Sequence, residues 1–220
     1  MIMTSKKEMK IAAFSDCHWL YKQIKEFPKA DILIFAGDWC GNGESLYETY
    51  QFVNWFKKLP YEYKVAIPGN HDIFCENNES YCKVLFKEIG ATLLVDEIIE
   101  IKGLKIYGTP WCPEFNNWAY MKEEKDLKLI FKQIPENLDI LITHTPPKTI
   151  CDPNGYGSEV LFKKIKKIKP KIHIFGHAHE GYGFTETINT KFYNVAVCSD
   201  SDKEHNYTYE MINPITIIEI

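Results

Sequence analysis

Five short apolar segments of this 220-residue chain each run directly into a cluster of acidic, amide or imidazole side chains. The segments are rich in Ile, Leu, Val, Phe and Ala, and they have the length and composition of buried β-strands. Because the carboxyl ends of parallel strands meet at one edge of an open sheet, where ligands bind, we expect the clusters to converge on a single site. The clusters are Asp16-Cys17-His18, Gly37-Asp38, Gly69-Asn70-His71-Asp72, Thr143-His144 and Gly176-His177-Ala178-His179.

A glycine stands at the start of three of these clusters, at Gly37, Gly69 and Gly176. Glycine lacks a Cβ, so it permits a sharp turn at the end of a strand and a close approach of the backbone to a site. We therefore expect these three turns to border the site directly.

The order of the predicted elements indicates an α/β fold with two packed mixed sheets flanked by helices. Strand and helix patterns alternate in the first half of the chain, which is typical of parallel sheets, whereas the hairpin-like runs 97–107 and 184–197 predict antiparallel additions. Helices are predicted at 45–58, 79–89, 123–133 and 158–168. Strands are predicted at 10–15, 31–36, 63–67, 91–95, 98–101, 104–107, 139–143, 171–175, 184–187, 191–196 and 216–220.

Length and composition suit one compact domain that spans residues 1–220. The hydrophobic share of 45% is enough for a sizeable core, and no repeat or long linker interrupts the chain. The first residues, MIMTSKKEMK, lack the apolar stretch of a signal peptide or a membrane span, which predicts a cytoplasmic protein without membrane association. The seven cysteines are scattered without a CxxC pair, as expected for reduced thiols.

The converging side chains form a mixed nitrogen and oxygen donor set. Two aspartates, one asparagine and four histidines suit Zn, Mn or Fe, whereas Ca or Mg would favour oxygen alone. Seven ligands are too many for one ion, but two ions roughly 3.5–4 Å apart, bridged by Asp38, would use them in a centre suited to in-line displacement at phosphorus. The chain contains no arginine, so phosphate charge must be met by metal, lysine, histidine or backbone groups.

In this order, the motifs D-x-H, GD, GNHD, H and GHxH resemble the signature of the calcineurin-like metallophosphoesterases, from Asp16 to His179. The segments THTPP (143–147) and GHAHEGYG (176–183), with Asn194-Val195-Ala196, are similar to the metallophosphoesterase-domain-containing (MPPED-like) branch of that superfamily. The fold of the family is a four-layer α/β/β/α sandwich, which agrees with the two sheets expected above. The resemblance implies a hydrolase that acts on phosphoric esters.

The resemblance also implies a role for each site residue. His71 would protonate the leaving oxygen, and Asp72 would orient and charge its ring. A hydroxide bridging the two ions (Mn²⁺, Fe²⁺/Fe³⁺ or Zn²⁺) would be the nucleophile, without a covalent enzyme intermediate. One ion would be held by Asp16, His18, Asp38 and His179, and the other by Asp38, Asn70, His144 and His177.

The favoured function is a phosphodiesterase acting on small or cyclic phosphodiesters, including nucleotides. The complete ligand set, the His71–Asp72 pair and the single compact domain favour it. The same centre could serve a phosphomonoesterase or a phosphoprotein phosphatase. The net charge of −4 disfavours a nuclease, and a non-catalytic metal-binding scaffold is the least favoured, because none of the expected ligands is missing.

Several other features have both a functional and a structural interpretation. Trp39, Trp111 and Trp118 could wall a pocket or pack in the core. His173 is expected to be structural or exposed, and His205 to lie in a loop. The lysine-rich run 163–171 is predicted to be an amphipathic helix with a solvated basic face. The loops expected to wall the pocket are 40–45, 73–80, 111–120 and 146–158.

Overall fold

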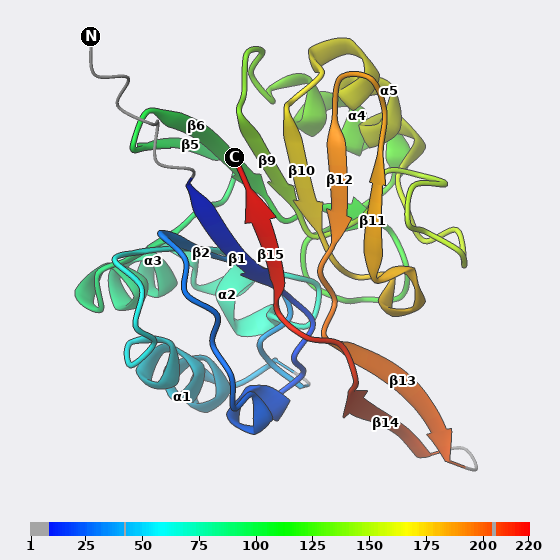
Figure 1. Cartoon of the computed structure of the whole chain (residues 1–220). Coiled ribbons are helices and arrows are strands. Elements are labelled where there is room, and N and C mark those ends of the chain that lie inside the picture. Colours follow the sequence, from blue (N-terminus) through cyan, green and yellow to red (C-terminus); the bar gives the residue numbers. More distant parts are fainter. Residues whose placement is uncertain (1–8, 42, 204–205) are drawn as a thin grey trace, which may run out of the picture.

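Two mixed β-sheets, packed face to face, form the centre of the computed structural model, which describes residues 9–41, 43–203 and 206–220 (Figure 1). In the first sheet four neighbouring strands are parallel, and the last strand of the chain pairs antiparallel with the first. Its order is β15 (Thr216–Glu219), β1 (Lys10–Phe14), β2 (Ile32–Ala36), β3 (Tyr63–Ile67) and β4 (Ala91–Leu93).

The second sheet has four parallel strands and an antiparallel strand at each edge. The two antiparallel edges are the hairpins predicted from the sequence. Its order is β11 (Gly183–Glu186), β12 (Lys191–Asn194), β10 (Ile172–Phe175), β9 (Ile140–Thr143), β6 (Leu104–Thr109) and β5 (Glu97–Ile101). All eleven strands predicted from the sequence are present, with ends that differ by one or two residues.

Alternation along the strands divides their side chains between two layers. Ile34 and Ile142 point into the aliphatic core between the sheets, where both are fully buried. Their neighbours Phe35 and Leu141 point outward, against the helices. This period of two explains why the central strands are apolar throughout, since both of their faces are covered.

Helices cover the outer face of each sheet and complete the predicted four-layer α/β/β/α sandwich (Figure 1). α1 (Leu46–Phe56) and α3 (Glu79–Glu88) lie on the first sheet, whereas α4 (Glu124–Lys132) and α5 (Glu159–Ile168) lie on the second. In α5, Ile165 and Ile168 are buried while the lysines face solvent, so the interpretation of the lysine-rich run as an amphipathic helix is confirmed. Among the described residues, no helix has the length and apolar character needed to span a bilayer.

Several short elements were not predicted from the sequence. They are the helix α2 (Ile73–Asn77), the 3₁₀ turns at Leu20–Gln23 and His179–Gly181, the two-residue strands β7 (Cys112–Pro113) and β8 (Met121–Lys122), and the hairpin of β13 (Cys198–Lys203) and β14 (Asn206–Met211). The hairpin extends away from both sheets (Figure 1). The sequence of β13, CSDSDK, is polar after its first residue and lacks the apolar alternation of a half-buried strand, whereas β14 does alternate, through Tyr207, Tyr209 and Met211.

Loss of packing between the sheets should destabilise the fold. We expect Ile142→Ala to lower the free energy of unfolding by about 2–5 kcal/mol, because it leaves a cavity in a close-packed core. Urea denaturation measures this change. The matched control is Ile188→Ala in the turn between β11 and β12, where the side chain is 99% exposed and a change within about 0.5 kcal/mol is expected. Equal effects of the two substitutions would contradict the assignment of the core.

Candidate metal centre

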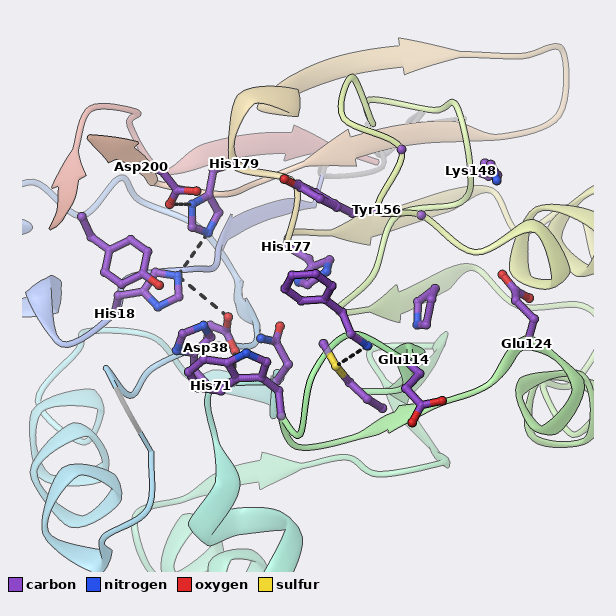
Figure 2. Close-up of a pocket in the computed structure, with 18 residues that line it drawn as sticks. His18, Asp38, His71, Glu114, Glu124, Lys148, Tyr156, His177, His179 and Asp200 are labelled. Atoms are coloured by element: carbon purple, nitrogen blue, oxygen red, sulfur yellow. Dashed lines mark hydrogen bonds and ion pairs between the residues drawn. The ribbon is translucent and has the colours of Figure 1, made fainter. Parts of the chain in front are cut away.

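The carboxyl ends of β1, β2, β3, β9 and β10 bring the predicted clusters together at one pocket (Figure 2). A parallel main-chain bridge between Ser15 and Ala196 connects the end of β1 to the segment after β12, so the strand ends of the two sheets adjoin. All seven side chains predicted to bind metal lie in this region: Asp16, His18, Asp38, Asn70, His144, His177 and His179.

Left-handed backbone turns follow three of these strands. Asp16, Asp38 and His177 have φ values of 54°, 64° and 67°, and His18 has a φ of 36°. This region is sparsely populated by residues that carry a Cβ, and such strain is characteristic of functional sites. Main-chain hydrogen bonds continue between the turns after β1 and β2, from the N–H of Asp16 to the Gly37 carbonyl and from the N–H of Cys17 to the Asp38 carbonyl, and they keep the functional groups at the sheet edge.

Two glycines approach the carboxylates too closely to allow any side chain. A Cβ at Gly69 would collide with the Asp38 carboxylate, and a Cβ at Gly176 would collide with that of Asp16. The expectation that the glycine turns border the site is therefore confirmed. Backbone packed so closely around two carboxylates fixes where those groups point.

Asp38 lies between imidazole rings from both sheets. Its Oδ2 is 3.3 Å from Nε2 of His144 and 3.8 Å from Nε2 of His18. Its Oδ1 accepts a hydrogen bond of 2.7 Å from the backbone N–H of His71. The side chain expected to bridge two ions thus faces histidines of both groups.

Asp16 lies beside Asp38 and faces a different pair of rings. Its Oδ1 is 3.4 Å from Nε2 of His179 and 3.9 Å from Nε2 of His144. Both of its oxygens accept the backbone N–H of His177, at 3.0 Å each. Nε2 of His179 is also 3.1 Å from Nε2 of His18, so these rings present their nitrogens to one point.

A second group of donors lies around His144. Oδ1 of Asn70 is 2.9 Å from its Nε2, and the ring of His177 is 5.1 Å away, centroid to centroid. The Ala36 carbonyl, on β2, accepts a hydrogen bond of 2.8 Å from Nδ1 and so directs Nε2 toward the site. The buried thiol of Cys112 also belongs to the group with His144 and His177, which sequence reasoning missed because Cys112 lies in no motif.

The two buried aspartates of this centre are ionised, as a site that binds cations requires. Burial alone would raise the pKa of Asp38, but the adjacent His144 and His71 hold it well below its usual range. Burial likewise opposes the charge on Asp16, yet His179 and His144 keep its pKa lowered. Both side chains are therefore carboxylates, as metal binding requires.

The histidines differ in their protonation. Burial lowers the pKa of His18 and of His177 to about 3, so both rings are neutral and can donate lone pairs. Burial also opposes the charge on His144 and on His179, but the carboxylate of Asp38 raises the pKa of His144 to about 9, and bonds to Asp16 and Asp200 raise that of His179 to about 10. Protons on these rings compensate two buried carboxylates, which is the task a bound cation would perform.

The donor set therefore fits two transition-metal ions. Asp16, His18 and His179 form one compact group, and Asp16, Asp38 and His144 form another. The mixture of imidazole nitrogen with carboxylate and amide oxygen is the type that suits Zn, Mn or Fe. The metal-binding roles remain predictions, with Asp38 and Asp16 both placed between the two groups.

His71 and Asp72 lie at the site, but not as an orienting pair. The Gly41 carbonyl, rather than Asp72, accepts the hydrogen bond from Nδ1 of His71. The fully buried Asp72 carboxylate accepts backbone N–H bonds from Asp38 (3.0 Å), Cys40 (3.1 Å) and Gly69 (2.7 Å). Asp72 was expected to orient and charge the ring of His71. Its oxygens instead accept from three donors in two loops, so its geometry does not match that role.

The pocket extends from the histidines toward Lys148 and Glu124 and has a volume of about 460 Å³ (Figure 2). The predicted loops 111–120 and 146–158 do wall it, through Phe115, Trp118 and Tyr156 among others. Loops 40–45 and 73–80 do not, since none of their described residues lines the pocket. The first segment contributes the Gly41 carbonyl that contacts His71. The second is not a loop, because it contains all of α2 and the first residues of α3.

The three tryptophans have separate roles. Trp39 is fully buried and stacks on Phe52, so it belongs to the core. Trp111 donates a hydrogen bond of 2.7 Å to Asp96 and does not line the pocket. Trp118 stacks on His71, with ring centroids 4.1 Å apart, and forms a wall of the pocket.

His173 and His205 are the remaining two of the seven histidines in the sequence. His173 is fully buried, and its Nε2 lies 2.8 Å from the Thr143 hydroxyl, so its structural interpretation is confirmed. His205 lies outside the described residues.

Comparisons with known proteins agree with this geometry. The family model described as calcineurin-like phosphoesterase matches residues 9–181. A UPF0046 protein of Caenorhabditis elegans is 33% identical over 213 residues, which cover 81% of this chain and 53% of that protein. Human metallophosphoesterase domain-containing protein 1 is 31% identical over 234 residues, which cover 94% of this chain and 69% of that protein. The chain thus spans about half the length of the worm relative.

Among solved structures, a protein of Thermus thermophilus shares the fold. The TM-score is 0.66 at 12% sequence identity, and the match covers 94% of this chain and all of that one (100%). At this identity the likeness concerns the fold alone.

Removal of the Asp72 carboxylate should destabilise the loops under the site. We expect Asp72→Ala to lower the free energy of unfolding by at least roughly 1–3 kcal/mol, because buried N–H donors lose their acceptor. Chemical denaturation of the metal-free protein measures this. The control is His71→Ala, which removes a part-buried ring whose hydrogen bond goes to the Gly41 carbonyl, and this substitution should cost less. An Asp72→Ala variant as stable as the wild type would contradict the structural role.

Proposed function

This chain belongs to the calcineurin-like phosphoesterase family, whose members are metal-dependent phosphoesterases, and on that premise we propose that it is a phosphodiesterase acting on small or cyclic phosphodiesters, nucleotides included. The observation that carries this proposal is the convergence of two buried carboxylates, one amide and four imidazoles at one end of a 460 Å³ pocket. A pocket of this size suits a small molecule.

The residues divide into two groups that would hold the metals. Asp16, His18 and His179 would hold one ion, Asn70, His144 and His177 the other, and Asp38 would be shared. When bound, the ions supply Lewis acidity, which polarises the phosphoryl group and makes a water acidic enough to attack it at neutral pH.

His71 is placed to act on the leaving group. Because the Gly41 carbonyl can only accept, Nδ1 of His71 carries a proton, and Nε2 is left to face a substrate in the pocket. The imidazole lies nearly perpendicular to the His18 ring and stacks on Trp118, at centroid distances of 4.6 and 4.1 Å. A proton on Nε2 would be donated to the departing alkoxide, the role of a general acid.

The charge of the pocket favours a diester over a monoester. Lys148 is the one lysine among the described residues that line the pocket, and it lies at the end remote from the histidines (Figure 2). The chain has no arginine to clamp a dianion. A phosphomonoester carries about −1.5 to −2 charges at pH 7, whereas a diester carries a single negative charge, which needs less compensation.

The walls also favour an organic group on each side of the phosphorus. Trp118 stands beside His71, and Phe115 and Tyr156 line the rest of the pocket. Aromatic faces bind flat, apolar groups and stack on nucleobases. A nucleotide diester would place its phosphate at the histidines and its base along these walls.

The ester preference can be measured directly. With Mn²⁺ present, we expect the protein to hydrolyse bis-p-nitrophenyl phosphate and a cyclic nucleotide with a kcat/KM at least about tenfold above that for p-nitrophenyl phosphate, a difference of about 1.4 kcal/mol. Addition of a chelator should abolish turnover, and added Mn²⁺ should restore it. Faster hydrolysis of the monoester would favour a phosphatase instead, and turnover that is insensitive to chelator would contradict the metal mechanism.

A comparison of two leaving groups tests whether His71 is the general acid. We expect His71→Ala to lower kcat by about 10²- to 10⁴-fold for a cyclic nucleotide, whose alkoxide leaving group needs a proton. The loss should be much smaller for a p-nitrophenolate leaving group, which departs without one. Metal content measured in parallel shows whether the variant keeps its ions. Equal losses for both leaving groups, with the metal content intact, would exclude His71 as the general acid.

A further inference from the structure

The β13–β14 hairpin contributes two residues to the site from outside the stretch that matches the family model. The match ends at residue 181, whereas the hairpin spans Cys198–Met211. Asp200 and Tyr209 are direct partners across the two strands, so both project from the same face. Cys198 and Met211, the next pair on that face, pack against the core, which directs this face toward the domain.

Asp200 fixes the orientation of one predicted ligand. Its Oδ1 accepts a hydrogen bond of 2.8 Å from Nδ1 of His179 (Figure 2). The proton on Nδ1 leaves Nε2 as the nitrogen that carries the lone pair when the ring is neutral. Nε2 is the atom that faces Asp16 and His18, at 3.4 and 3.1 Å.

Tyr209 holds the ring of the other predicted ligand in this group. Its ring stacks on that of His18, with centroids 3.7 Å apart and planes inclined by 7°. Nδ1 of His18 is buried and has no hydrogen-bond partner among the described residues. Stacking by Tyr209 therefore takes the place of the hydrogen bond that usually orients a metal-binding imidazole.

The second group of donors is oriented in another way. The Ala36 carbonyl of β2 holds Nδ1 of His144, so the first sheet itself directs this ring. Neither Asp200 nor Tyr209 has a hydrogen bond or ring contact with His144 or His177 among the contacts between described residues. The two halves of the centre thus depend on different parts of the molecule.

We propose that the cross-strand pair of Asp200 and Tyr209 positions His179 and His18 and thereby sets the affinity of one metal position, the one these histidines form with Asp16. The position at His144 is independent of the hairpin. This inference rests on the proposed two-metal function. Removal of a partner that orients a metal ligand typically weakens metal binding by roughly 10- to 100-fold.

Titration of the metal-free protein with Mn²⁺, followed by calorimetry and by metal analysis, tests the inference. We expect the wild type to bind two ions. Asp200→Ala and Tyr209→Leu should each lower the affinity for one ion by roughly 10- to 100-fold and leave the affinity for the other unchanged. Asp200→Asn should restore part of the loss, because its amide oxygen can still accept from Nδ1 of His179.

Controls separate a positioning role from a general one. Glu210→Gln removes the same charge from the opposite face of the hairpin and should leave both affinities unchanged. Each metal-free variant should still unfold cooperatively on heating, with a Tm only slightly below that of the wild type, since Asp200 is half exposed and the hairpin lies outside the two sheets. Three results would overturn the inference. They are an equal loss of affinity for both ions, wild-type affinity for both ions in Asp200→Ala, and the same loss of affinity in Glu210→Gln. A wild type that binds no metal would instead overturn the proposed function on which it rests.

Discussion

Asp16 and Asp38 place two carboxylates side by side in the interior, at the ends of neighbouring parallel strands, and both are almost inaccessible to water. Ionised groups in such a position require cations and hydrogen-bond donors nearby. The structure supplies both: imidazole rings surround the carboxylates, backbone N–H groups of His71 and His177 reach them, and glycines leave room for the main chain. The left-handed turns after the strands follow from the same need, because they keep these groups at the sheet edge.

A third buried carboxylate maintains this arrangement without facing the pocket. Asp72 binds N–H groups of the loops that follow β2 and β3, and so holds Asp38 and Gly69 in register. The three polar residues of the GNHD motif thus have different surroundings: Asn70 reaches His144, His71 lines the pocket, and Asp72 joins two loops. Adjacent residues have different tasks because each points to a different side of a tight turn.

The two halves of the centre are supported unequally. The sheet backbone orients His144, whereas a peripheral hairpin that lies beyond the matched family region contacts His18 and His179. Elements outside the sheets carry few buried contacts and open more readily than core strands. The half contacted by the hairpin therefore depends on an element that lies outside the two sheets.

The sequence by itself determined the strands of the two large sheets, the four main helices and the convergence of seven donor side chains. Apolar periodicity marks each central strand, and parallel strand ends must meet at one edge. It did not determine the role of Asp72, the burial of Trp39, the loops that wall the pocket or the contacts of Asp200 and Tyr209. Those depend on which groups meet in space after folding. Local patterns in the sequence indicate whether a residue lies in a strand or a helix. A ring contact between residues as distant as His18 and Tyr209 forms only when the sheets and the hairpin are packed together.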